Sequence, residues 1–138
     1  YKNIETMFTN IPICDDLKLL YFLIGDTTKE YNINDWNIFS LNEVCENYEL
    51  MKSFTNNQIV DFAYMSIGMG HVLICAYDSK TASFFIRRSG GSNSFDREIN
   101  FDFFCNYKAQ EDKHDNFQYI LDIFNGKYNL NDLKIVEN

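Results

Sequence analysis

The sequence IVDFAYMSIGMGHVLICAYDSKTASFFIRR, residues 59–88, contains three β-strand patterns in succession. Two turn sequences, at 68–70 and 78–81, divide it into segments rich in β-branched and aromatic residues. We therefore predict strands over 59–67, 71–77 and 82–88. The middle segment is apolar on both faces, which is typical of a central strand. Because the connecting turns are short, the three strands are expected to pair in an antiparallel sheet.

Upstream of this stretch, residues 15–23 have the pattern of an amphipathic helix. Asp15 or Asp16 is expected to cap its first turn by accepting backbone N–H bonds, and Gly25 is expected to end it. The polar residues 26–37 predict a loop, with a short strand near 36–39. The apolar face of the helix has the spacing i, i+3, i+4 and i+7: Leu17, Leu20, Tyr21 and Ile24.

A second helix is predicted over 40–54, because Ser40-Leu41-Asn42-Glu43 is a capping box. Asn56-Asn57 marks the turn that follows it. Downstream of the strands, helices are expected at 100–105, capped by Asn100, and at 116–125, ended by Gly126. The order predicts an α+β fold: a single domain with a mainly antiparallel, twisted sheet packed against several helices.

Composition excludes several classes of protein. The chain has 138 residues, of which 46% are hydrophobic, enough for one buried core and too many for wholesale disorder. Its longest apolar run, 19–24, is far shorter than the roughly 20 residues of a membrane span. The formal net charge of −8 repels phosphate, so neither nucleic acid nor a membrane is an expected partner.

Cysteine usage indicates a reducing compartment. The four cysteines lie about 30 residues apart in apolar contexts, which is typical of free buried thiols: Cys14, Cys45, Cys75 and Cys105. No N-glycosylation sequence or secretory leader pattern is present, so we expect an intracellular, cytoplasmic protein. Abundant Asn, Ile, Lys, Tyr and Phe resemble AT-rich coding, as in some large DNA viruses, protists and low-GC bacteria; a viral protein would act in the host cytoplasm.

The sequence contains no recognisable catalytic motif. On one strand, His71 and Cys75 would lie roughly 13 Å apart, whereas a nucleophile and its base must lie within about 3 Å. No histidine has a second ligand at metal spacing. Gly68-Met69-Gly70 lies between two strands and lacks the helix of a dinucleotide loop. We therefore expect no enzymatic activity, no cofactor and no metal.

Two groups of residues are candidates for binding. The first group is Arg87, Arg88 and Arg97, which lie near the Gly90-Gly91 loop in the sequence. Arginine guanidinium groups next to free backbone N–H groups can hold a phosphate or a carboxylate. The alternative, which we favour, is that these arginines neutralise nearby acids. Trp36 lies in an acidic segment and is either an interface anchor or a cover for the edge of the core.

Four motifs follow one another over residues 10–107: Ile11-Pro12 with the helix to Gly25, Ile38 to Val44, Ile67 to Asp78, and Asn100 to Phe104. Their order resembles the SUKH superfamily, the domain of fungal cell-wall synthesis regulators and many bacterial immunity proteins. Compared with that family, the glycine-rich turn is reduced and the 87–91 loop is elaborated, while 108–138 is expected to be a C-terminal helical extension.

This resemblance implies a non-enzymatic protein-binding module, either immunity-protein-like or an adaptor in host conflict. Eight excess negative charges would steer a basic protein partner towards the chain. The alternatives are a small anionic ligand-binding domain that uses Arg87, Arg88, Gly90, Gly91 and Arg97, and a viral structural or assembly protein. The expected partner-binding residues are acids and one aromatic of the N-terminal third: Asp15, Asp16, Asp26, Asp35 and Trp36.

Overall fold

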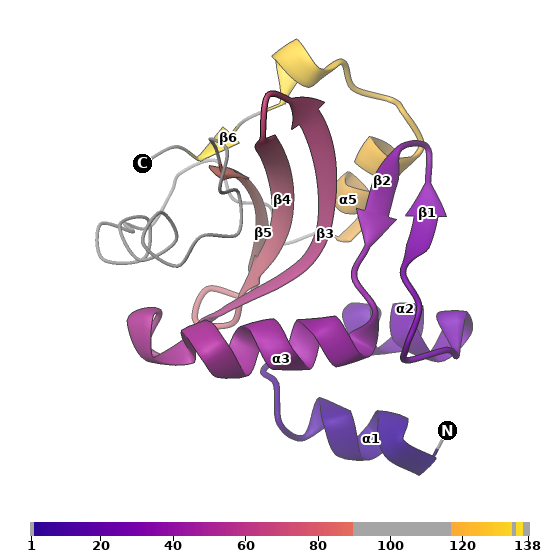
Figure 1. Ribbon diagram of the computed structural model, residues 1–138, viewed down its shortest axis with the longest axis vertical. Coiled ribbons are helices and arrows are strands. Elements are labelled where there is room, and N and C mark those ends of the chain that lie inside the picture. The colour runs from indigo at the N-terminus through magenta and orange to yellow at the C-terminus, as the bar shows by residue number, and fades with distance from the viewer. Residues whose placement is uncertain (1, 90–116, 134, 137–138) are drawn as a thin grey trace.

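The computed structural model describes residues 2–89, 117–133 and 135–136, and its centre is a six-stranded sheet (Figure 1). Strand order in the sheet follows chain order, and neighbouring strands are antiparallel except β5 and β6, which are parallel. The strands are β1 (Tyr31–Ile33), β2 (Trp36–Ile38), β3 (Ile59–Gly68), β4 (His71–Asp78), β5 (Ser83–Ser89) and β6 (Ile135–Val136). The α+β class and the antiparallel centre of the sheet are as predicted.

The described helices lie on one face and at one end of this sheet (Figure 1). In Figure 1, α3 crosses one end of the sheet, and α1 lies on the side of α3 away from the strands. Two 3₁₀ turns, Lys52–Phe54 and Leu130–Asp132, follow α3 and α5. The helices are α1 (Lys2–Phe8), α2 (Asp15–Ile24), α3 (Leu41–Met51) and α5 (Phe117–Phe124).

All of these helices contribute to one hydrophobic core. Because side chains alternate along a strand, Leu73, Cys75 and Tyr77 of β4 point to the face that the helices cover. The neighbours Val72, Ile74 and Ala76 point to the opposite face and are buried as well, as expected for a central strand. The helices bury against the first face Ile4, Phe8, Leu17, Tyr21, Leu41, Val44, Ile120 and Phe124.

Local signals in the sequence set several boundaries. Ser40 accepts from the Glu43 backbone N–H while Glu43 accepts from the Ser40 N–H, each at 3.1 Å, which confirms the capping box. Gly25 and Gly126 have positive φ angles of 78° and 76° where α2 and α5 end. The helix predicted over 40–54 ends at Met51 and continues as a 3₁₀ turn.

Other predictions about the elements were wrong. The cap of α2 is Cys14, and no side chain makes a cap hydrogen bond there, so neither Asp15 nor Asp16 acts as the cap. The 26–37 loop contains β1, and the short helix α1 was not predicted. The expected helix at 100–105 and the Gly90-Gly91 loop lie outside the described residues.

The C-terminal segment is part of the core. The tilted contact between the rings of Phe124 and Trp36, with centroids 5.8 Å apart, joins α5 to β2. The Asn34 side-chain amide donates to the Phe124 carbonyl at 2.8 Å, and β6 adds a strand beside β5. Residues after 108 therefore include elements that complete the domain, rather than only extending it.

Candidate functional site

Helix α2 has two apolar faces, of which only one is buried. Leu17 is fully buried and Tyr21 is 3% exposed, with its hydroxyl donating to the Phe39 carbonyl at 3.0 Å. On the other side Leu19, Phe22 and Leu23 are 58%, 48% and 76% exposed. Their spacing of three and four residues places them together on the helix surface. We call Leu19, Phe22 and Leu23 the apolar ridge.

The sequence of α2 explains why the ridge exists. Between Leu17 and Ile24 every residue except Lys18 is apolar or aromatic. A helix packed on a sheet from one side buries only one stripe of its surface, so the remaining apolar side chains face solvent. Exposed apolar patches of this kind mark interaction surfaces in soluble proteins.

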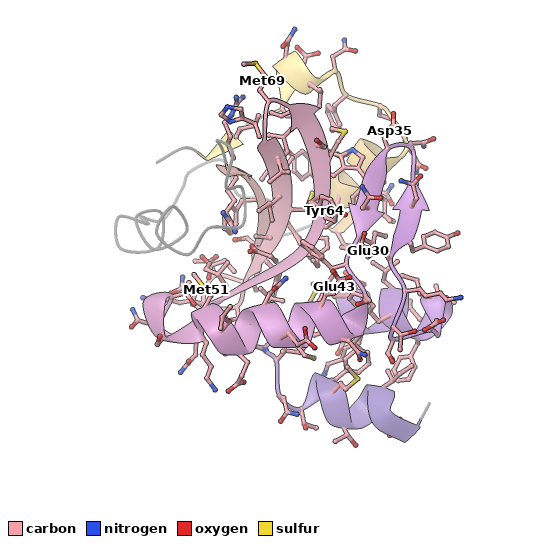
Figure 2. All side chains as sticks on the ribbon, viewed as in Figure 1. Glu30, Asp35, Glu43, Met51, Tyr64 and Met69 are labelled. Atoms are coloured by element: carbon pink, nitrogen blue, oxygen red, sulfur yellow. The ribbon has the colours of Figure 1, made fainter. Side chains whose placement is uncertain are left out.

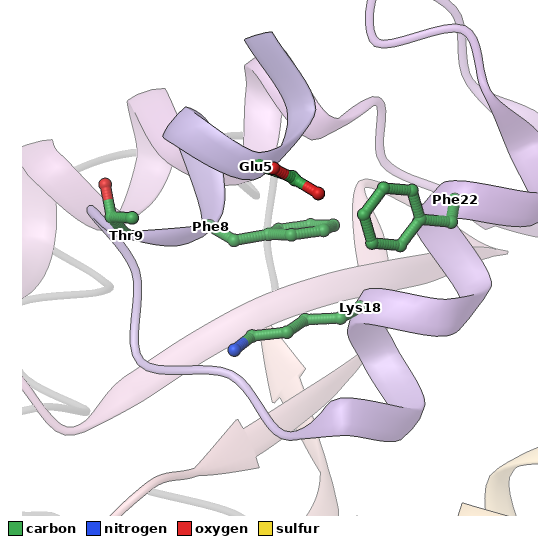
Figure 3. A pocket seen from close by; sticks show the side chains of 5 residues that line it. All are labelled: Glu5, Phe8, Thr9, Lys18 and Phe22. Carbon is green, nitrogen blue, oxygen red and sulfur yellow. The ribbon is translucent and has the colours of Figure 1, made fainter. Parts of the chain in front are cut away.

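A pocket of about 270 Å³ opens beside the ridge, between α1 and α2. Figure 3 shows the Phe8 ring between the Glu5 and Lys18 side chains, with the Phe22 ring beside it. The two rings meet edge-to-face with centroids 5.2 Å apart. Thr9 completes the lining. The pocket therefore has an apolar floor, one acidic group and one basic group.

Acidic residues flank both ends of the ridge. Asp15 and Asp16 are exposed in the first turn of α2, and Asp26 is exposed just after its end. Asp26 accepts from the Thr28 hydroxyl at 2.6 Å and the Thr28 N–H at 2.8 Å, and these bonds lower its pKa. Nine acidic and three basic residues give residues 1–51 a formal charge of −6, out of −8 for the chain.

The structure does not bring Asp35 and Trp36 into this surface. Asp35 lies in the turn between β1 and β2 with φ at 70°, at the tip of the hairpin in Figure 2. Asp26 precedes β1 and therefore lies towards the other end of the same hairpin. Trp36 is only 3% exposed and packs on Phe124, so its assignment as a partner-binding residue was wrong. The ring covers the core.

The proposed anion site is not assembled in the part of the chain that the structure describes. Arg87 is 2% exposed, and its Nη2 donates to Asp61 Oδ2 at 2.7 Å. This buried ion pair corrects the expectation that Arg87 binds a ligand, and it agrees with the alternative that the arginine neutralises an acid. Arg88 is exposed, while Gly90, Gly91 and Arg97 lie outside the described residues.

A carboxyl pair that sequence reasoning missed joins α3 to the segment before β1. The Tyr64 hydroxyl donates to Glu30 Oε1 at 2.8 Å (Figure 2). Burial raises the pKa of Glu30, and the hydrogen-bonded carboxyl of Glu43 raises it further, while the Tyr64 bond opposes the shift. Burial and the Glu30 bond raise the pKa of Tyr64 to about 12. The fold therefore groups Glu30 with Tyr64 and Glu43, which are far apart in the sequence.

The signal for this pair was only half visible in the sequence. Glu43 was identified as the acidic member of the capping box, where its Oε1 accepts from the Ser40 N–H. Its meeting with Glu30 depends on the pairing of β2 with β3, which brings Tyr64 opposite Asn37. No spacing rule connects residues 30, 43 and 64. Long-range pairing of strands was needed to find them.

Within the described residues, no three His, Cys, Asp or Glu side chains are grouped so that they could hold a metal ion. In the same part of the chain, no helix has the length and apolar character needed to cross a membrane. The described cysteines are Cys14, Cys45 and Cys75, all free, and burial raises the pKa of each thiol. Cys105 lies outside these residues.

Comparison with known proteins gives no relative: no family model, no curated protein and no solved structure matches the chain.

Proposed function

We propose that this protein is a non-enzymatic protein-binding module whose binding surface is the apolar ridge of α2 and the acids around it. The observation that carries the proposal is the exposure of Leu19, Phe22 and Leu23 on one helix face. Fully burying such a side chain contributes about 1.5–3 kcal/mol. Since roughly half to three quarters of each is still exposed, a docked partner would gain about 1–2 kcal/mol from each.

The charge distribution supports a basic partner. The concentration of negative charge in residues 1–51 accelerates the encounter with a positively charged protein. The low pKa of Asp26 keeps this carboxylate ionised next to the ridge. The resemblance to the SUKH superfamily also implies a protein-binding module. The role in immunity or host conflict that this resemblance implies stays a prediction. The anion-binding alternative is weakened because Arg87 is bound to Asp61.

The experiment compares two double variants as bait in extracts of the source cell. Leu19→Ser with Leu23→Ser removes most of the ridge. Leu50→Ser with Leu130→Ser changes two leucines that are similarly exposed, at 52% and 45%, but lie on other elements. A protein captured by the wild type and the Leu50/Leu130 control, and lost with the ridge variant, supports the proposal. Equal capture by both variants would refute it.

The acidic contribution is tested with the captured protein after it has been purified. Asp26→Lys changes a charge beside the ridge, whereas Asp35→Lys changes one at the hairpin tip. We expect the first variant to reduce the association rate severalfold at low salt and the second to reduce it less. Equal effects would mean that the net charge of the chain, and not the ridge, guides association.

A further inference from the structure

The pocket between α1 and α2 and the charges around the ridge specify the partner's chemistry. We infer that the partner docks a basic amphipathic helix on α2 and places one apolar side chain in the pocket lined by Phe8 and Phe22. This inference rests on the proposed function, because it names the occupant of the same surface.

The size of the pocket favours a single side chain. Its volume of about 270 Å³ lies below the range of about 300–1,000 Å³ that is typical of small-molecule sites. Two aromatic rings in edge-to-face contact line it. An apolar side chain that enters between α1 and α2 would contact both rings.

The shape of the ridge favours a helix as the docking element. Leu19 and Leu23 are one turn apart, and Phe22 lies beside them, so the three form part of a ridge on a helix surface. Such ridges pack into the grooves of a second helix, and an amphipathic helix laid along an apolar groove is a common mode of recognition. The exposed face of α2 is therefore suited to a helical partner.

The charges favour a basic helix. Asp15 and Asp16 lie at one end of α2 and Asp26 lies just past the other, and the ten residues of α2 separate them by roughly 15 Å. A partner helix with lysine or arginine at both ends of an apolar stripe would match this arrangement. At the pocket itself Glu5 and Lys18 contribute one charge of each sign, so the preference for a basic helix comes from the acids at the two ends of α2.

The same charges disfavour two other occupants. A second copy of this chain would place the −6 charge of residues 1–51 against an identical charge. An anionic membrane surface would be repelled in the same way, because such surfaces attract basic and not acidic segments. A basic protein segment is the occupant that gains from both the apolar and the charged parts of the surface.

The test uses three synthetic peptides of about 18 residues, long enough for a helix to form on the surface. The first has a leucine stripe with lysines at both ends. The second has the same stripe with glutamates, and the third keeps the lysines but has alanine at the centre of the stripe. Binding to the full chain is measured by isothermal titration calorimetry at low and moderate salt.

We expect the lysine–leucine peptide to bind at least about tenfold more tightly than the other two, a difference of about 1.4 kcal/mol. The Leu19/Leu23 double variant should lose this binding, while the Leu50/Leu130 control should keep it. Phe22→Ala should weaken binding of the leucine peptide more than that of the alanine peptide. Equal binding of the lysine and glutamate peptides would overturn the inference.

The remaining outcomes separate the inference from the proposed function. If capture from extract depends on the ridge but the lysine–leucine peptide does not bind, the partner's chemistry is wrong and the function stands. If the chain dimerises in sedimentation at the concentrations used, and the Leu19/Leu23 variant does not, a second copy is the occupant and the inference fails. Ridge-dependent binding to anionic vesicles, with no peptide binding, would also overturn it.

Discussion

Leu17→Ala and Leu23→Ala are the same substitution on the same helix, and we expect losses of stability of very different size from them. Leu17 lies on the face of α2 that packs on the core and is fully buried, whereas Leu23 lies on the ridge and is 76% exposed. The change in helix propensity is small and similar at the two interior positions. The difference in stability between the variants therefore measures how α2 is oriented on the sheet.

The magnitudes follow from burial. Removing a fully buried leucine side chain costs about 2–5 kcal/mol, because the transfer free energy is lost and a cavity is left behind. At Leu23 about a quarter of the side chain is covered, so the loss is roughly 0.5 kcal/mol. For a chain of this length about 3–4 °C of melting temperature corresponds to 1 kcal/mol. We expect Leu17→Ala to lower the melting temperature by roughly 10 °C and Leu23→Ala by about 2 °C or less.

The assay is thermal and urea unfolding of both variants and the wild type, followed by circular dichroism. The urea slope shows whether the unfolded state has changed, which would make the free energies incomparable. A loss of 2 kcal/mol or more in Leu23→Ala would place Leu23 in the core. That result would refute both the orientation of α2 and the existence of the ridge.

Three further predictions concern stability alone. The pKa of Glu30 is raised above its ordinary 4.5. The stabilisation that comes from its protonated form is therefore fully present below pH 4.5 and is lost as the pH rises through the raised pKa. Melting from acid to neutral pH should show Glu30→Gln free of this loss and more stable than wild type at neutral pH, because the partly buried charge and its repulsion by Glu43 are both removed. Ser40→Ala should cost about 1 kcal/mol in urea unfolding through the lost cap, and no change would mean that the capping box adds nothing. Asp61→Ala should lower the free energy of unfolding by about 3 kcal/mol, and by more than Arg87→Met does. The reason is that Arg87 is 2% exposed and Asp61 17%, so removing Asp61 takes the ion-pair partner from the more deeply buried charge. The reverse order in chemical denaturation would contradict this difference in burial.

Several short-range signals in the sequence were reliable, although the cap expected at Asp15 or Asp16 was not. The capping box at Ser40 and the glycines at 25 and 126 act within one turn of helix, so their outcome does not depend on the rest of the fold. The central strands were predicted well for a related reason. An alternating apolar pattern predicts a strand with one buried face, and a continuous apolar run predicts a strand with two.

Elements that depend on distant partners were missed. Strand β1 is only three residues long and mostly exposed, and it exists because β2 pairs with it. A signal was present, since Asn34 and Asp35 both have positive φ angles, as a two-residue hairpin turn requires, and Asn and Asp tolerate this conformation. Strand β6 left no such signal, because its parallel pairing with β5 joins residues about 49 apart in the chain.

The candidate surface was partly within reach of sequence reasoning. Residues 19–24 served to exclude a membrane span and to define one buried helix face, although a run of apolar residues all around a helix also predicts that part of it remains exposed. Trp36 could not be assigned from its neighbours. Its burial depends on Phe124, which the sequence places 88 positions away. Acidic flanks at 15, 16 and 26 were found because charge patterns are local.

The separation of the ridge from the core has a consequence for how the proposal can be tested. Leu19 and Leu23 contribute little to folding, so substitutions there leave the domain intact while changing its surface. Residues 52–138 carry a formal charge of only −2, and the buried Arg87–Asp61 pair lies in that part of the chain. Most of the net negative charge therefore lies in residues 1–51, the part of the chain that also contains the ridge. If these features served only solubility, exposed leucines on α2 would be a disadvantage, because they raise the tendency to aggregate. Their presence beside conspicuous negative charge is explained by a partner that covers the leucines and neutralises the acids at the same time.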